Sequence, residues 1–412
     1  MHPNSLRLII QTSIILLISV ALVTAQASCN IDIDDVMSQV ESVCISIDDN
    51  QVCYGNFEVN TIAQANAPTQ DFSEQGDLAD VAYIRSLYLS GLNPDTETWG
   101  IAQMRLVTPT ATGNQDINLL LFGDIEVENA VEETISFDVT VNDSAANVRN
   151  SPRSTALVLA SIPSGENIEA VGRLEDNSWL RVNLGDDGIG WVASFLVSPA
   201  DEDNNLEDLA VQESSTPYFG AMQAFYFTDG GTSQCGNLNA DGLLIQTPEG
   251  SARVTLLINE VSIELIPGAN GSTALVSGNA IDGMTVSVID GEAVVASNGS
   301  SFFVGASEET TIPLDENLSA IGSPALPVNF DVEEMSNLPL LPLFRDGSIP
   351  IVPLITGNNG SIGNDGSGSG TNTNSDTGSG SNSNANGNGN GNGNANGNAN
   401  GNSNGNKNGN GN

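Results

Sequence analysis

The sequence predicts a mainly β, multi-domain fold with a single helical segment near its N-terminus. Short runs of β-branched and aromatic residues recur between Gly, Pro, Asn and Asp along most of the chain, which is typical of strands separated by turns. One stretch instead repeats apolar residues at steps of three and four, as an amphipathic helix does. The predicted division of the chain is a signal peptide (1–27), an N-terminal α+β module (28–135), a small β-barrel (137–198), an acidic linker (199–217), an antiparallel β-domain (218–318), a proline-rich segment (319–356) and a disordered Gly/Asn/Ser tail (357–412).

The N-terminal module is expected to hold the helix, over residues 33–44, followed by strands. The strands are predicted at residues 84–89, 99–107 and 117–127. Residues 117–122 are almost all apolar, so this part is expected to be a central strand.

The second region contains five short β-type runs that are separated by turn residues. They cover residues 145–148, 158–162, 168–173, 179–182 and 190–193. Strands this short and this evenly spaced favour a small barrel.

Four motifs in this region resemble bacterial SH3 (SH3b) domains. They are A-N-V-R-N-S-P at residues 146–152, I-P-S-G at 162–165, W-L-R-V at 179–182 and G-W-V at 190–192. The family usually has Gly near the position of Asn150, so the first loop departs from its pattern. The resemblance implies a small SH3-like barrel that binds peptides, cell-wall material or neighbouring domains and is not itself catalytic.

The third region is predicted to be a meander of strands. They are expected at residues 222–228, 243–247, 253–259, 261–265, 284–289, 292–296 and 302–304. Asp290-Gly291 and Asn298-Gly299 are each expected to close a two-residue hairpin. Residues 285–295 resemble the V-x-V-x-x-G-x-V-x-V repeat of FecR-like domains, which implies an envelope-associated β-roll. The prolines of residues 324–353 suit an extended segment, either packed on a domain surface or held by an SH3-like groove.

The N-terminal residues predict export. Arg7, an apolar core at residues 14–23 and the small-x-small site A-Q-A at 25–27 form a signal peptide, so the mature protein is expected to be secreted or on the cell surface. An even number of cysteines in an exported chain favours disulfides. Of the three connectivities open to Cys29, Cys44, Cys53 and Cys235, we favour Cys44–Cys53, across a short turn region, with Cys29–Cys235.

The composition excludes several classes of chemistry. The chain has 51 acidic and 10 basic residues, a formal net charge of −41, one histidine and one lysine. The histidine, His2, lies in the signal peptide, and Lys407 lies in the tail. Ser-His-Asp catalysis, His-bound zinc and the P-loop therefore have no residues to use. We predict no catalytic residue, no metal and no cofactor, and we expect neither nucleic acid as a partner nor membrane insertion after signal cleavage.

Four residues of the barrel are candidates for ligand binding: Arg149, Trp179, Arg181 and Trp191. The arginines can bind carboxylates of cell-wall peptides in a bidentate manner, or instead form salt bridges with Asp186 or Asp187. The tryptophans can line a groove or pack inside the barrel, and Trp191 is expected to be the more exposed of the two.

The sequence thus predicts an exported, non-catalytic binding protein whose barrel docks cell-wall peptide, polysaccharide or a partner protein. Two alternatives stay open. The first is a secreted carboxylate-dependent hydrolase, with the barrel as its targeting domain. The second is a surface or matrix protein that associates with copies of itself.

Overall fold

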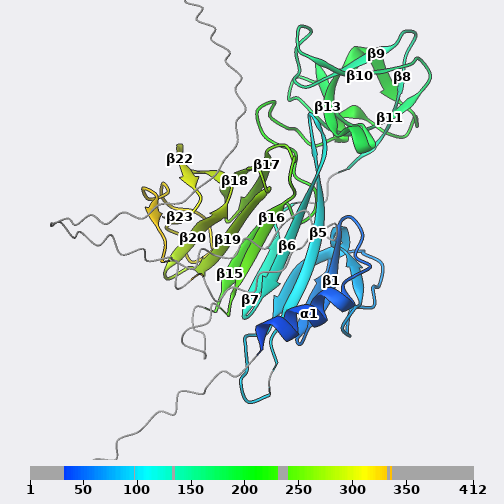
Figure 1. The fold of residues 1–412 in the computed structure, drawn as a ribbon. Helices are drawn as coiled ribbons and strands as arrows, with labels where there is room; N and C mark the ends of the chain where they lie inside the picture. The colour runs from blue at the N-terminus through cyan, green and yellow to red at the C-terminus, as the bar shows by residue number, and fades with distance from the viewer. Residues whose placement is uncertain (1–31, 97, 132–134, 231–239, 332–334, 336–412) are drawn as a thin grey trace, which may run out of the picture. The chain divides into compact units, whose positions relative to one another are not determined.

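The computed structural model describes residues 32–331 and 335, except residues 97, 132–134 and 231–239. This part of the chain is mainly β, with one α-helix and 24 strands arranged in three sheets (Figure 1). The predicted signal peptide, the Cys29–Cys235 pair, most of the proline-rich segment and the tail lie outside the described residues. Within them, no helix combines the length and the apolar character needed to cross a membrane.

The helix α1 (Ile33–Val43) forms where the apolar spacing predicts it. Its first turn is capped by Asp32, whose side chain accepts a hydrogen bond from the backbone N–H of Asp35. The helix ends at Cys44, which forms a disulfide with Cys53 in β1 (Gln51–Asn56). The predicted Cys44–Cys53 pair is confirmed, and it ties the end of the helix to the sheet below it.

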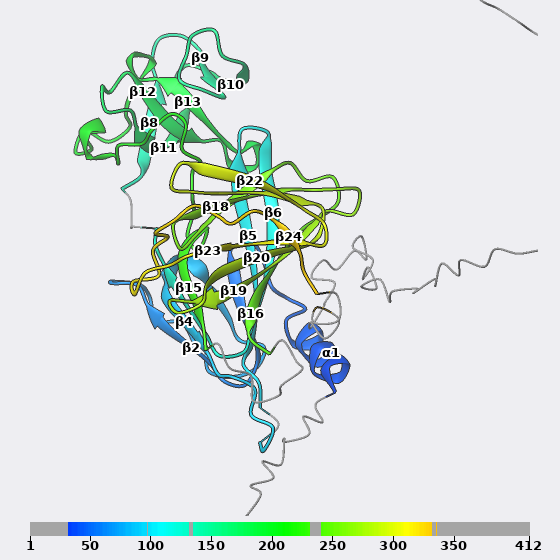
Figure 2. The same cartoon turned by 90° about the vertical axis from the view of Figure 1, so that its left-hand side faces the viewer.

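A nine-stranded sheet forms one layer of the body. Its order is β24 (Val328–Asn329), β23 (Glu308–Ile312), β20 (Gly283–Asp290), β19 (Ser272–Asn279), β16 (Gly242–Thr247), β6 (Gly113–Phe122), β5 (Ile101–Thr110), β1 and β3 (Leu78–Asp80). The apolar stretch 117–122 lies in β6, which has neighbours on both sides, so the expected central strand is confirmed. Figure 2 shows α1 on the outer side of this sheet.

An eight-stranded sheet forms the second layer. Its order is β2 (Val59–Ala63), β4 (Ile84–Leu89), β7 (Ile125–Asn129), β15 (Ala224–Asp229), β17 (Val254–Ile258), β18 (Val261–Ile266), β21 (Glu292–Ser297) and β22 (Ser300–Gly305). All its pairs are antiparallel except β15 with β17. The predicted strand 117–127 is therefore two strands in different sheets, because the turn at Gly123 passes the chain from β6 to β7. Gly123 has φ +89°, and a Cβ there would lie 2.1 Å from the Ala240 carbonyl oxygen.

Both layers bury side chains in one apolar core. Leu119 of β6 and Val127 of β7 belong to the same buried cluster as Phe227, Ile245 and Val286, which lie far later in the chain. The strands before and after the barrel therefore share two sheets and a core. The predicted domain boundaries at 135 and 218 stay a prediction.

The two predicted hairpins have different outcomes. Asn298-Gly299 joins β21 to β22, with Ser297 opposite Ser300, and both turn residues have positive φ, so this hairpin is confirmed. The hairpin at Asp290-Gly291 is wrong, because β20 pairs with β19 and β23 whereas β21 pairs with β18 and β22. This Asp-Gly pair carries the chain between sheets, since both strands have apolar faces to bury in one core. The FecR-like resemblance of these residues stays a prediction.

The barrel is a seven-stranded antiparallel sheet with its own core. Its order is β10 (Val158–Ile162), β9 (Ala146–Arg149), β13 (Ile189–Ala193), β12 (Trp179–Asn183), β11 (Asn167–Arg173), β8 (Phe137–Val141) and β14 (Val197–Pro199). The core contains Val148, Val182 and Val192. The barrel is inserted between β7 and β15, which are neighbours in the body sheet with Asn129 opposite Phe225.

Asn259, in the turn between β17 and β18, extends the pairing of β15. Its fully buried side chain accepts from the Phe227 N–H at 2.7 Å and donates to the Phe227 carbonyl at 2.8 Å. We expect Asn259→Ala to lower the free energy of unfolding by about 2–4 kcal/mol, because it leaves two buried backbone groups unpaired. Asn66→Ala is the control, since Asn66 also has positive φ but is exposed. Urea denaturation that gives equal losses for both variants would contradict this role.

Asp241, at the start of β16, is a second expected determinant of stability. Its Oδ1 accepts from the Asp124 N–H at 2.8 Å. Burial raises the pKa of Asp241 to about 6; this hydrogen bond opposes the rise, and the charges of Asp229 and Asp124 add to it. The folded protein therefore binds more protons than the unfolded chain between about pH 4 and pH 6, and the group's contribution to stability falls as the pH rises through this window. Asp241→Asn keeps the acceptor and removes the charge.

We therefore expect Asp241→Asn to be more stable than the wild type at pH 7–8, with the difference vanishing below pH 4. Thermal denaturation across this pH range measures the difference. Asp143→Asn, at an exposed aspartate, controls for the change in net charge. A constant difference between the Asp241→Asn variant and the wild type at every pH would refute the assignment.

Candidate functional site

Three of the four candidate ligand-binding residues form a row across the barrel. Arg149 in β9 lies opposite Trp191 in β13, which lies opposite Arg181 in β12. Residues opposite one another in a sheet share a face. The adjacent residues Val148, Val192 and Val182 are in the barrel core, so the row lies on the outer face of the barrel. Trp179 is two residues before Arg181 on the same strand and lies on the same face.

The side chains of this row are more buried than the sequence predicts. Trp191 is only 3% exposed, whereas Trp179 is half-buried, so the expectation that Trp191 is the more exposed tryptophan is wrong. The Arg181 guanidinium stacks over the Trp191 ring, with its Cζ 4.5 Å from the ring centroid. Residues 214–218 and the hairpin tip at 108–111 line a small cavity with both side chains. These segments are far from the barrel motifs in sequence, which is why local patterns did not indicate the burial.

Arg181 is itself a buried cation, 5% exposed. Its Nη2 donates to the Thr216 carbonyl at 2.8 Å. Burial lowers its pKa to about 10, and the nearby Tyr218 phenol raises it, so the guanidinium remains protonated at neutral pH. The cation is stabilised by an aromatic face and a carbonyl oxygen in place of a carboxylate.

The alternative of arginine salt bridges with Asp186 or Asp187 is not realised. Arg149 donates instead to the carbonyl of Ala156, at 2.6 Å, and this bond closes its own loop. The salt bridges found among the described residues involve Arg85, Arg105 and Arg253 of the body. Ligand binding by Arg149, Trp179, Arg181 and Trp191 stays a prediction.

The segment after the barrel is bound along β11. Arg173 donates through Nε and Nη2 to the carbonyls of Leu209 and Glu207. The Arg173 N–H also donates to the Ala210 carbonyl, and the Gln212 N–H donates to the Arg173 carbonyl. Leu209 is buried in the barrel core. A Cβ at Gly172 would lie 2.5 Å from the end of the Gln212 side chain and would displace it from its hydrogen bond to the Val171 carbonyl. The stretch predicted as an acidic linker is therefore bound to the barrel here. Leu206 and Leu209, three residues apart, are the sequence feature that could have predicted this packing.

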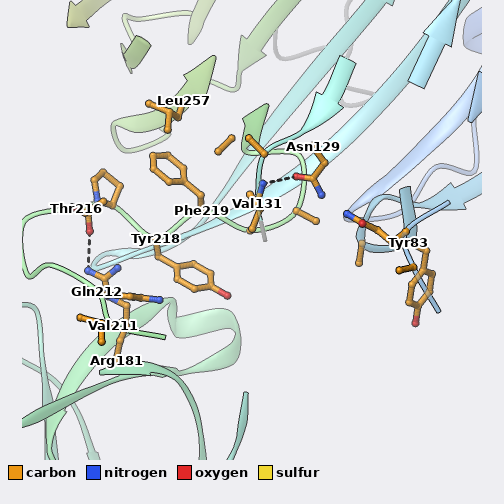
Figure 3. A pocket seen from close by; sticks show the side chains of 18 of the residues that line it. Tyr83, Asn129, Val131, Arg181, Val211, Gln212, Thr216, Tyr218, Phe219 and Leu257 are labelled. Carbon is orange, nitrogen blue, oxygen red and sulfur yellow. Dashed lines mark hydrogen bonds between the residues drawn. The ribbon is translucent and has the colours of Figure 1, made fainter. Parts of the chain in front are cut away.

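A cavity of about 700 Å³ opens beside Arg181 (Figure 3). Its walls include the half-buried apolar side chains of Phe219, Leu257 and Val131. Tyr83 and Val211 also line it and are 39% and 54% exposed. The cavity is therefore largely apolar with one buried cation among its lining residues, an arrangement that suits binding of a small organic group.

Tyr218 lies beside Arg181 in the lining of the cavity (Figure 3). Burial raises the pKa of its phenol, as does Glu169, while Arg181 opposes this effect. The hydroxyl is therefore protonated at neutral pH and can donate a hydrogen bond. Sequence reasoning identified Arg181 but missed Tyr218, Phe219 and Tyr83, because they lie on segments that look like connections.

The described residues contain no group of three or more His, Cys, Asp or Glu side chains gathered to hold a metal ion. The polar side chains that line the cavity, by contrast, are a guanidinium, two phenols, amides, the Thr216 hydroxyl and the carboxylate of Glu213. These groups can orient a ligand through charge and hydrogen bonds.

Comparison with known proteins identifies one part of the chain. Residues 144–198 match the family model of the bacterial SH3 domain. Neither the curated proteins nor the solved structures contain a significant match to the chain. The chain therefore carries a bacterial SH3 domain at residues 144–198, and the resemblance based on the four motifs is confirmed there.

Proposed function

We propose that this protein is an exported, non-catalytic binding protein that recognises its ligand at the cavity beside Arg181. The observation that carries this proposal is the buried Arg181 of the bacterial SH3 domain, which lines a cavity of about 700 Å³ between apolar walls. The ligand is cell-wall peptide, polysaccharide or a partner protein. Export is supported by the predicted signal peptide and by the Cys44–Cys53 disulfide, a bond typical of oxidising compartments.

Arg181 and Tyr218, the two neighbouring polar side chains of the cavity, favour binding over turnover. Arg181 is protonated at neutral pH, and the Tyr218 phenol is protonated as well, so neither is an effective general base there. Both can hold a ligand by charge and hydrogen bonds. Because Trp191 is already covered, we expect recognition at the cavity beside the barrel and not on an open aromatic groove.

The position of the insertion allows a direct test. The N–H groups of Val131 and Met222 both donate to the Asn129 side chain, so the two ends of the insertion meet at one residue. Replacing residues 133–217 with a short Gly-Ser linker should therefore keep both body sheets. We expect this variant to keep cooperative unfolding and the Cys44–Cys53 disulfide but to lose at least tenfold in retention on the polymer or partner that the mature protein binds.

Sedimentation with purified bacterial cell walls, and capture on immobilised polysaccharide, measure retention. Asp143→Asn in the full mature chain, at an exposed barrel residue outside the cavity lining, is the matched control and should keep full retention. Undiminished retention by the folded, barrel-free variant would overturn the proposal.

A further inference from the structure

The guanidinium of Arg181 has donors that the protein does not use. Within the part of the chain that the structure describes, its one hydrogen bond runs from Nη2 to the Thr216 carbonyl. Among the described residues, Arg181 has no carboxylate partner, and neither Nε nor Nη1 is among the buried nitrogens sealed from solvent without a partner. These two nitrogens therefore keep some exposed surface, and the side chain to which they belong lines both cavities. A planar guanidinium with two open donors matches the two oxygens of a carboxylate.

The acidic residues around the cavity limit the negative charge that a bound ligand can carry. Glu213 lines the cavity, and the charge of Glu169 adds to the burial that raises the pKa of the Tyr218 phenol. The whole chain has a net charge of −41. A ligand with several negative charges is therefore repelled, whereas one carboxylate is compensated by the single cation. Phe219 and Leu257 supply an apolar wall for the group that bears it.

We propose that the cavity beside Arg181 binds the free carboxylate of a short ligand with an apolar side chain, such as the carboxyl end of a peptide. The carboxylate bonds the open donors of Arg181 and the hydroxyl of Tyr218, and the apolar side chain contacts Phe219. This inference rests on the proposed function and specifies the chemical class that the site takes.

The decisive experiment compares an acid with its amide on the mature wild-type protein. Isothermal titration calorimetry is performed with N-acetyl-Ala-Leu as the free acid and as the carboxyl-terminal amide. We expect the acid to bind at least tenfold more tightly, because the amide cannot compensate the buried cation. Equal affinities, or no binding of the acid at millimolar concentration, would overturn the proposal.

Variants locate the site and the source of the carboxylate. Arg181→Met should abolish the preference for the acid, whereas Arg153→Met, at an exposed arginine of the same barrel, should leave it unchanged. Preference for the acid that survives Arg181→Met in a folded variant also overturns the proposal. Titration with 4-phenylbutyrate distinguishes a small organic acid from a peptide: comparable affinity supports a site for any apolar carboxylate, and weaker binding supports a peptide end.

The two proposals fail separately. Retention on polymer that requires residues 133–217 but shows no acid preference leaves the barrel as the binding module and removes the carboxylate site. If the protein prefers the acid but is not retained on polymer, the carboxylate site stands and the proposed polymer-binding function is removed.

Discussion

The pairing of β7 with β15 is the constraint on which the rest of the structure depends. These strands are separated in sequence by the whole bacterial SH3 domain, yet Asn129 lies opposite Phe225 and the Ala130 N–H donates to the Ala224 carbonyl. Because the pair belongs to the apolar core of the body, the chain must leave and return at one place. The cavity lies where the departing and returning segments come together, with Val131 and Phe219 both in its lining.

Burial of Arg181 is the main departure from the ordinary rules of folding. A buried charge is costly unless it is paired, and this one has an aromatic face and a carbonyl oxygen in place of an acid. A Met or Leu at position 181 would pack on Trp191 without that cost. Such a substitution by hydrophobic residues is often neutral or stabilising in proteins, so fold stability alone does not account for the arginine. The carboxylate site that we propose beside the cavity supplies a reason for a positive charge at this position.

Local signals made much of the fold predictable. The spacing of Ile33, Val36, Met37 and Val40 specified α1, and the barrel strands follow the alternation and motifs of residues 146–193. What could not be predicted is non-local. The Asp290-Gly291 turn has the chemistry of a hairpin, but the partners of β20 and β21 lie in different sheets. Strands β19 and β23 were missed because their mixed polar and small residues resemble loops. Strand β8 was missed although F-D-V-T-V has the alternation of a strand.

The difference between local and non-local signals also explains why only part of the site was predicted. Arg181 was identifiable because basic residues are scarce and it lies within a barrel motif. The burial of Arg181 by Thr216 and Tyr218 was not predictable, because these two residues belong to a polar stretch with no strand or helix pattern. These residues hold Arg181 on one side and line the cavity on the other. A ligand that bonds Arg181 therefore also contacts the segment that fixes the barrel's outer face, so binding and the position of this segment are energetically linked.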